Sequence, residues 1–147
     1  MNILVLTLFG FAVWTLLVLL GTVGVYRWNH ILRGSISIER FRAGEDMGSE
    51  FYRRAMRAHA NCVENLPVYG AIVLTACFFG ISGYFIPILA VVFLTARIFQ
   101  TLIHVLFPET GFSVSVRFGF FLIQIICMLA MAVIILAHIQ IPCVCAG

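Results

Sequence analysis

The chain has 147 residues, of which 63% are hydrophobic and 10% are charged, and its mean hydropathy is +1.10. Soluble domains contain roughly 45–50% apolar residues, so this composition excludes an ordinary soluble domain. The formal net charge is +3, and all nine basic residues are Arg. Because these Arg residues flank strongly apolar segments, we expect them to lie against a membrane and not to bind nucleic acid.

Four apolar segments are long enough to cross a membrane, because a hydrocarbon core of about 30 Å requires about 20 apolar residues in a helix. The first segment lacks a preceding basic region and is too long for a cleavable signal peptide. Gly80, Gly83 and Pro87 separate the second and third segments, and Pro108 and Gly111 separate the third and fourth. The sequence therefore predicts one domain over residues 1–147, an all-α integral membrane protein built as a four-transmembrane-helix bundle. The expected helices cover approximately residues 3–27, 50–81, 85–107 and 112–141.

The Arg residues are distributed on one side of this predicted topology. Seven of the nine lie between the first two apolar segments, namely Arg27, Arg33, Arg40, Arg42, Arg53, Arg54 and Arg57. The positive-inside rule places this first loop in the cytosol and both termini on the opposite side. For Arg27, Arg33, Arg40 and Arg42 we favour attraction to anionic headgroups, at about 1 kcal/mol each. Tyr26, Trp28 and Tyr52 are predicted to form an aromatic belt at the same interface.

A polar stripe runs from the first loop into the second predicted helix. Arg57, Asn61 and Glu64 have the spacing i, i+4 and i+7, which places them on one helix face, and Arg54 lies a turn earlier. Ionisable groups inside a membrane usually face a bundle interior or a wet cavity. The stripe therefore predicts a binding site. The alternative is a helix end whose charged side chains are simply solvated by water. We favour this alternative only for Arg53 and Arg54.

The third predicted helix carries a second stripe, with Gln100, Thr101 and His104 at i+3, i+4 and i+7 from Arg97. Arg97 lies about 16 Å below the turn at Pro108, which is too deep for complete snorkelling. We expect it to contact a ligand or to pair with a carboxylate such as Glu64.

Arg117 opens the fourth helix beside several Phe residues. We expect it to belong to the binding site, and contact with lipid headgroups is the alternative. Cys62, Cys77 and Cys127 are expected to fill space inside helices. Cys143 and Cys145 are too close together for a Cys-x-x-Cys pair, and no metal site is predicted.

The run from Glu50 to Pro67 resembles the signature of the MAPEG family, the membrane-associated proteins in eicosanoid and glutathione metabolism. Its core, Arg-Ala-His-x-Asn-x-x-Glu-x-x-Pro, is matched at every fixed position. The resemblance extends to a long first loop, an Arg in the third helix and an Arg opening the fourth. It implies a homotrimer of four-helix bundles that binds glutathione between adjacent subunits near the cytosolic face.

The resemblance also implies roles for individual residues. Arg57, Asn61 and Glu64 correspond to the glutathione-binding residues of the second helix, and Arg117 corresponds to the Arg beside the thiol. Arg97 corresponds to the binding Arg of the third helix, and Arg27 to a further binding Arg. The helix faces described above add Arg54, Gln100 and His104 as binding positions. The chain departs from the prostaglandin and leukotriene synthases in having Phe118 directly after the fourth-helix Arg and Phe121 at a Tyr position, while His104 occupies another Tyr position.

The chemistry of glutathione agrees with these residue types. Its two carboxylates suit the bidentate guanidinium fork, and Glu64 is placed to accept its ammonium or to hold an Arg. A thiol with a pKa of about 8.5 is mostly protonated at neutral pH, and we expect Arg117 to stabilise the thiolate with help from His104 or Gln100.

The predicted function is that of a glutathione-dependent membrane transferase or peroxidase acting on apolar electrophiles or lipid hydroperoxides from the bilayer. The alternative is a non-catalytic trimer that binds lipid or glutathione, which the loss of hydroxyls at Phe118 and Phe121 favours. A four-helix drug–proton exporter is disfavoured because its first helix requires a carboxylate. The short chain and the lack of a Lys-rich tail favour a bacterial inner membrane over the endoplasmic reticulum.

Overall fold

The computed structural model describes residues 2–34, 49–81 and 83–144, and the secondary structure in this part of the chain is entirely helical. The elements are α1 (Ile3–Val18), the π-helical segment η1 (Leu19–Gly24), α2 (Val25–Leu32), α3 (Glu50–Phe78), α4 (Phe85–Leu106) and α5 (Gly111–Val144). Among the described residues, four helices are long and apolar enough to cross a membrane: Ile3–Leu32, Glu50–Phe78, Phe85–Leu106 and Gly111–Ile139. The predicted four-span, all-α membrane fold is confirmed.

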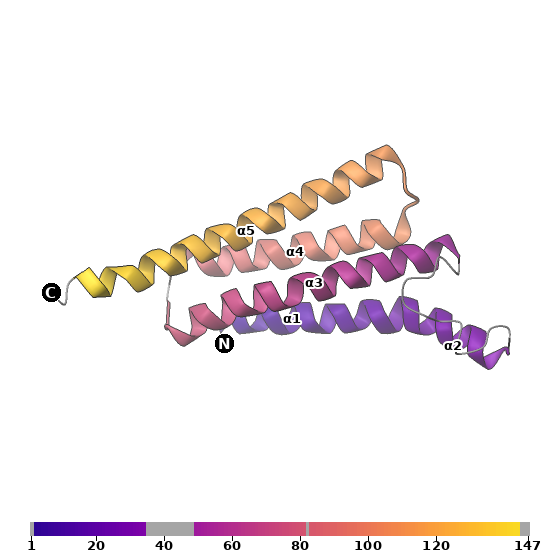
Figure 1. The fold of residues 1–147 in the computed structure, drawn as a ribbon, viewed down its shortest axis with the longest axis horizontal. Helices are drawn as coiled ribbons and strands as arrows, with labels where there is room; N and C mark the ends of the chain where they lie inside the picture. Colours follow the sequence, from indigo (N-terminus) through magenta and orange to yellow (C-terminus); the bar gives the residue numbers. More distant parts are fainter. Residues whose placement is uncertain (1, 35–48, 82, 145–147) are drawn as a thin grey trace.

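The four spans lie side by side and alternate in direction (Figure 1). Both termini and the turn between α3 and α4 lie at one end of the bundle. At the other end lie α2, the start of α3 and the turn between α4 and α5 (Figure 1). We call this second end the Arg-rich end, because Arg27, Arg54, Arg57 and Arg117 belong to the elements that meet there. The predictions made for Arg40, Arg42 and Cys145 concern positions outside the described residues.

Local sequence explains where the second and third spans begin and end. The Ser49 hydroxyl caps α3 by accepting the Tyr52 backbone N–H at 3.2 Å. After α3, Gly80 adopts a φ of +59°, a conformation that glycine tolerates and that terminates helices. Pro108 follows the end of α4 and cannot continue a helix. The breaks at Gly80 and Pro108 fall where the sequence indicates them.

The first span is longer than the sequence suggests. We expect it to end near Arg27, whereas the helix continues through α2 to Leu32, and Gly34 then adopts a φ of +62°. The chain from Val25 to Leu32 contains no Gly or Pro to stop the helix, so the charges that follow the apolar run do not end it. Arg27 therefore projects from within a helix and not from a helix end.

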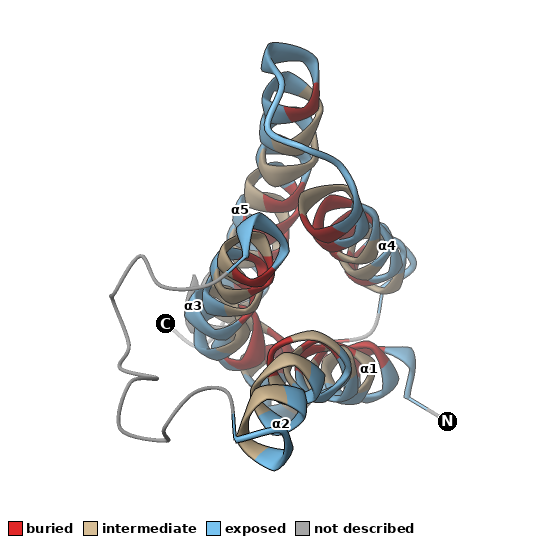
Figure 2. Cartoon of the chain, turned by 90° about the vertical axis from the view of Figure 1, so that its right-hand side faces the viewer, coloured by how far each residue is buried: buried red, intermediate tan, exposed pale blue. Residues whose placement is uncertain are grey.

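The core is centred on an aromatic stack shared by three spans. Tyr69 of α3 stacks on Phe93 of α4 with ring centroids 4.0 Å apart, and Phe11 of α1 meets both rings edge-on at 6.0 and 5.5 Å. The Tyr69 hydroxyl is satisfied by the Thr7 hydroxyl at 2.7 Å. Figure 2 shows the buried residues on the facing sides of the helices and the exposed residues outside. Large apolar side chains such as Phe9 and Leu74 are exposed on the outside, as expected of helices surrounded by lipid.

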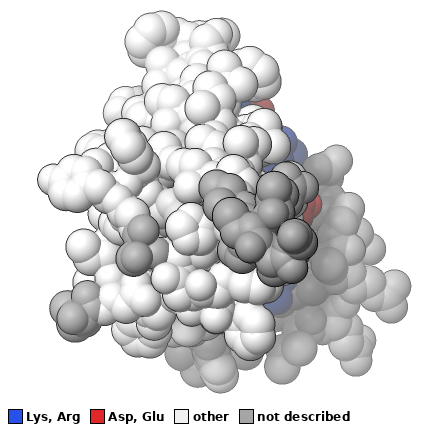
Figure 3. Space-filling view, turned by 90° about the vertical axis from the view of Figure 1, so that its left-hand side faces the viewer, with Lys and Arg blue, Asp and Glu red and all other residues white. Residues whose placement is uncertain are grey.

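The last helix packs mainly on α4 and contributes Cys127, Met128, Met131 and Ile135 to the core. Towards its Gly111 end, α5 leans away from the other helices (Figures 1 and 2). Arg117 of α5 nevertheless contacts α4, through Gln100 and His104. At the opposite end of the bundle, the described residues that face the viewer in Figure 3 are almost all uncharged.

Candidate functional site

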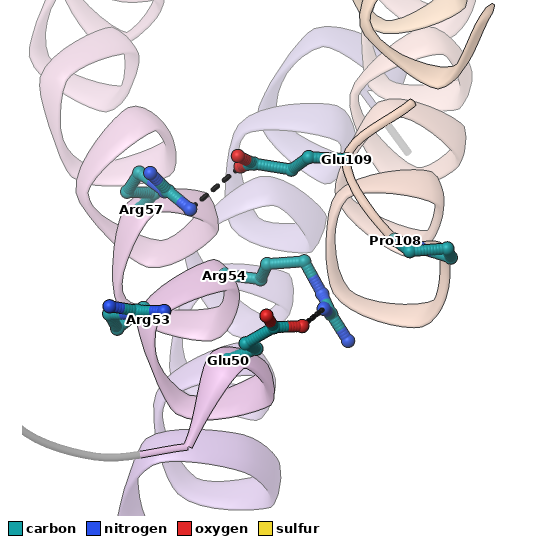
Figure 4. Close-up of a pocket in the computed structure, with 6 residues that line it drawn as sticks. All are labelled: Glu50, Arg53, Arg54, Arg57, Pro108 and Glu109. Atoms are coloured by element: carbon teal, nitrogen blue, oxygen red, sulfur yellow. Dashed lines mark ion pairs between the residues drawn. The ribbon is translucent and has the colours of Figure 1, made fainter. Parts of the chain in front are cut away.

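A shallow cavity of about 200 Å³ opens at the Arg-rich end. Its lining comes from the first turns of α3 and from the turn between α4 and α5, and consists of Glu50, Arg53, Arg54, Arg57, Pro108 and Glu109 (Figure 4). Three of these side chains are guanidinium groups, and two are carboxylates. The cavity is therefore a polar, cation-rich surface at the mouth of an apolar bundle.

Glu109 is the carboxylate at the centre of this surface. One of its oxygens, Oε1, lies 2.7 Å from Arg57 Nη2 and 3.8 Å from Arg117 Nη1. Figure 4 shows the Arg57 side chain reaching from α3 towards Glu109 on the neighbouring turn. Two guanidinium groups from separate spans thus converge on one carboxylate oxygen, as binding of an anionic ligand group requires.

Arg117 is further fixed by His104 of α4. Arg117 Nη1 lies 3.0 Å from His104 Nδ1, and a guanidinium group can only donate hydrogen bonds. Nδ1 must therefore accept, which makes His104 neutral, with its proton on Nε2, while this bond is present. The Arg117 side chain is only 12% exposed, so it belongs to the inner part of the site.

Arg54 links the cavity to α4. Its Nη1 lies 3.8 Å from Glu50, and its Nε donates to the Val105 carbonyl at 3.4 Å. The structure therefore gathers four residues predicted from the sequence at one end of the bundle: Arg54, Arg57, His104 and Arg117.

Arg97 and Gln100 lie inside the bundle instead. Arg97 is 1% exposed, donates from Nη1 to Gln100 Oε1 at 3.1 Å, and lies over the Phe11 ring at 5.5 Å. Its Nε and Nη2 have no hydrogen-bond partner among the described residues. The pairing of Arg97 with Glu64 that we considered from the sequence does not occur, because Glu64 is exposed on α3. Direct ligand contact by Arg97 and Gln100 stays a prediction.

Asn61 and Glu64 continue the stripe from Arg57 along α3. Asn61 is held by Asn65, whose Nδ2 donates to both the backbone and side-chain oxygens of Asn61 at 2.9 Å. Glu64 is exposed and forms none of the ion pairs found among the described residues. The stripe therefore faces the outside of the protomer, at the start of a membrane span.

Arg27 lies apart from the cavity and packs against α3. Its Nε donates to the Tyr52 hydroxyl at 2.8 Å, and its guanidinium carbon lies 5.9 Å from the Tyr52 ring centroid. Tyr52 is buried and stacks on Tyr26 at 4.5 Å. The prediction that Tyr52 belongs to an interfacial aromatic belt is therefore wrong, because its ring fills the contact between α2 and α3.

Sequence reasoning missed two residues of this region, Glu109 and Gln124. Glu109 lies in the Pro-Glu-Thr-Gly turn that is expected to face the same side as the Arg-rich loop, and that shared side is the signal for its role. Gln124 is fully buried and donates to Gln100 Oε1 at 2.9 Å. Its signal is an amide one heptad after Arg117 in an otherwise apolar run. No cluster of His, Cys, Asp and Glu among the described residues is suited to hold a metal ion.

The fold and the cavity define a class: a helical membrane protein with an Arg-rich cavity at one end of its bundle. Residues 4–137 match the model of the MAPEG family. The match covers most of the chain, and the chain belongs to this family, which includes glutathione transferases and related enzymes. Searches of curated proteins and of solved structures gave no match.

Proposed function

We propose that the protein is a glutathione-dependent membrane transferase or peroxidase. Arg57, Asn61 and Glu64 would bind glutathione along the outer face of α3, with Arg54 and Arg27 nearby at the Arg-rich end. Arg117 would stabilise the glutathione thiolate with neutral His104 beside it. The second substrate is an apolar electrophile or a lipid hydroperoxide that arrives through the bilayer.

The convergence of Arg57 and Arg117 on one oxygen of Glu109 is the observation that carries this proposal. A carboxylate at this position demonstrates that the two guanidinium groups are spaced to share one anionic oxygen. Glu109 is 44% exposed and Arg57 is 56% exposed, and such exposed pairs contribute only about 0–1 kcal/mol. Anionic groups of glutathione can therefore displace Glu109 at little cost, with a carboxylate at Arg57 and the thiolate at Arg117.

The chemical step follows from the position of Arg117. A guanidinium group in a poorly solvated site stabilises a thiolate more than a thiol, so it lowers the pKa of the bound glutathione thiol. In conjugation, the sulfur bonds to the electrophilic carbon while the leaving group departs with its electron pair. In peroxide reduction, the sulfur attacks the terminal oxygen, the O–O bond breaks, and the lipid leaves as an alcohol after taking a proton. A second glutathione then converts the sulfenic acid to glutathione disulfide and water.

Two observations support a binding site that is shared between subunits of a homotrimer. The cavity of one protomer has about 200 Å³, whereas small-molecule sites usually have about 300–1,000 Å³. In addition, Glu64 is exposed on a membrane-spanning helix, where lipid contact is costly for a carboxylate. A neighbouring subunit that covers this stripe would complete the site. The Arg-rich end is proposed to face the cytosol of a bacterium, with the protein in the inner membrane.

A non-catalytic binding protein on the same scaffold is the second candidate. Phe118 and Phe121 follow Arg117 where hydroxyl groups would otherwise be available to a thiolate, and Phe118 is 64% exposed towards the lipid side. These rings suit an apolar ligand as well as an apolar substrate. Turnover separates the two candidates, because a binding protein gives no product at any glutathione concentration.

The test uses the full chain in lipid nanodiscs, with glutathione and an aryl halide. We expect wild type to give conjugate and to lower the pH at which bound glutathione becomes thiolate, as measured by ultraviolet absorbance. Arg117→Ala should lower kcat by roughly 10²-fold, which is typical of losing one charge-stabilising donor. Arg57→Ala should mainly raise KM for glutathione.

Arg33→Ala is the matched control, because Arg33 is exposed at the end of α2 and does not line the cavity. It removes one positive charge at the same end of the bundle, and it should leave kcat and the KM for glutathione unchanged. Thiolate formation by Arg117→Ala at the wild-type pH would refute the assigned role of Arg117. Glutathione binding without any turnover would favour the binding protein.

A further inference from the structure

Two buried amides connect α4 and α5 directly beneath Arg117. Gln100 of α4 accepts hydrogen bonds through Oε1 from Arg97 Nη1 at 3.1 Å and from Gln124 Nε2 at 2.9 Å. The Nε2 of Gln100 donates to the backbone carbonyl of Arg117 at 3.2 Å. The chain of contacts therefore runs from one helix to the backbone of the proposed catalytic residue on the next.

Gln124 is held firmly in this network. It is fully buried, and its Nε2 donates to the Phe120 carbonyl at 2.9 Å as well as to Gln100. Its Oε1 has no partner among the described residues, so Nε2 provides the hydrogen bonds that orient the amide. A buried amide costs free energy unless it is hydrogen-bonded, and here the bonded group points at Gln100.

Helix α4 also contacts the guanidinium group of Arg117. His104 lies one turn beyond Gln100 on α4 and accepts from Arg117 Nη1 at 3.0 Å. Thus α4 contacts Arg117 twice, at its backbone through Gln100 and at its guanidinium through His104. Towards Gly111, α5 leans away from α4 (Figure 1), and the bonds of Gln100 and His104 to Arg117 join the two helices before that end.

We infer that Gln124 and Gln100 are positioning residues that hold Arg117 at a fixed height and rotation against α4. The inference rests on the proposed function, in which the position of Arg117 determines how strongly it stabilises the glutathione thiolate. Gln124 is fully buried, so it acts through its bond to Gln100 and, through Gln100, on the Arg117 backbone. A displacement of about 1 Å in an active site can lower the rate by roughly 10²-fold.

The central experiment compares Gln124→Leu with wild type in nanodiscs. Leu has a similar volume and removes the bond to Gln100. We expect glutathione affinity within about twofold of wild type, a kcat roughly tenfold lower, and thiolate formation shifted up by about one pH unit, which is the equivalent of a tenfold change. The pH shift is informative because a loss of overall stability would not move it.

A double variant tests whether the two amides act through one contact. Gln100→Met removes the bond to the Arg117 carbonyl directly and should reproduce the shift in thiolate formation. The Gln100→Met/Gln124→Leu variant should then shift it no further, because coupled residues are not additive. Additive shifts in the double variant would overturn the inference.

Thr7→Val is the matched control. It removes another buried hydrogen bond between spans, that of Thr7 with Tyr69, which has no connection to Arg117. It should lower thermal stability without moving the pH of thiolate formation. If Gln124→Leu behaves like Thr7→Val while Arg117→Ala loses the thiolate, the positioning role is wrong and the proposed function stands. If Arg117→Ala keeps the thiolate, the proposed function itself fails, and the inference fails with it.

Discussion

At the scale of single residues, Glu109 is the carboxylate on which two guanidinium groups converge. The distances of 2.7 Å to Arg57 and 3.8 Å to Arg117 make it the shared partner of both guanidinium groups. The residue lies in the turn after α4, and its carboxylate is 44% exposed. In the proposed site, such a carboxylate would compete with an incoming anionic ligand for the two Arg side chains.

Replacing Glu109 tests this competition. Glu109→Gln keeps the shape and removes the negative charge, so the two guanidinium groups become available. We expect the Kd for glutathione, measured by calorimetry at low salt, to fall roughly two- to fivefold, in line with the small energy of exposed ion pairs. Glu50→Gln is the control, because Glu50 is 79% exposed and its ion pair is with Arg54 and not with Arg57 or Arg117. Weaker binding by Glu109→Gln would indicate that Glu109 itself contacts the ligand.

The sequence predicted part of this site and not the rest. Helical spacing placed Arg57, Asn61 and Glu64 on one face, and the structure keeps them there as an outward stripe. Periodicity says nothing of which residues meet across helices, so the contact between Glu109 and Arg57 could not be read from it. The same reason explains why the bonds that join Gln100 of α4 to Gln124 and to the Arg117 carbonyl of α5 required the packed structure.

At the scale of elements, the contact of α1 with α3 and α4 depends on a small number of polar and aromatic groups. The Thr7 and Tyr69 hydroxyls bond at 2.7 Å beside the stacked rings of Tyr69 and Phe93. Between membrane helices the hydrophobic effect supplies little attraction, and packing and hydrogen bonds drive association. This contact should therefore set how firmly the first span is held.

A double-mutant cycle measures that contact. Thr7→Val and Tyr69→Phe each remove one hydroxyl, and each should lower the free energy of unfolding by about 1 kcal/mol. The double variant should cost about the same as one single variant, with a coupling of roughly 0.6–1.7 kcal/mol as found between membrane helices. Unfolding in a titration with a denaturing detergent gives these values. Zero coupling would show that the bond contributes nothing to the folded bundle.

The ends of the elements show which signals in the sequence suffice. Gly80 tolerates the positive φ that follows α3, Pro108 cannot continue α4, and the two helices stop beside these residues. Arg27 has no such preference, and the helix passes through it to Leu32. A change from apolar to charged residues marks a membrane boundary, whereas a helix end requires a residue that alters the backbone.

At the scale of the whole molecule, the polar stripe at Arg57 and Glu64 lies on the outside of a protomer whose other outward residues are largely apolar. In a membrane, such a stripe is stable when another protein surface or a ligand covers it. The proposed homotrimer provides this cover and enlarges the cavity of about 200 Å³.

Assembly and ligand binding should therefore be linked. Native mass spectrometry in a mild detergent is expected to show three copies of the chain with glutathione bound. A harsher detergent that releases folded monomers should abolish glutathione binding, with helical content by circular dichroism as the control for folding. Monomers that bind glutathione with unchanged affinity would show that a single protomer holds the complete site.

The charge-free end of the bundle also bears on how the protein enters a membrane. The turn between α3 and α4 contains no Arg, Lys, Asp or Glu, and the visible described surface around it is nearly uncharged (Figure 3). Transferring one charged side chain to the centre of a bilayer costs at least about 2.5–3.5 kcal/mol. The tip of the hairpin formed by α3 and α4 can therefore cross the hydrocarbon without carrying an ion, whereas Arg97 of α4 has to enter the interior of the bundle.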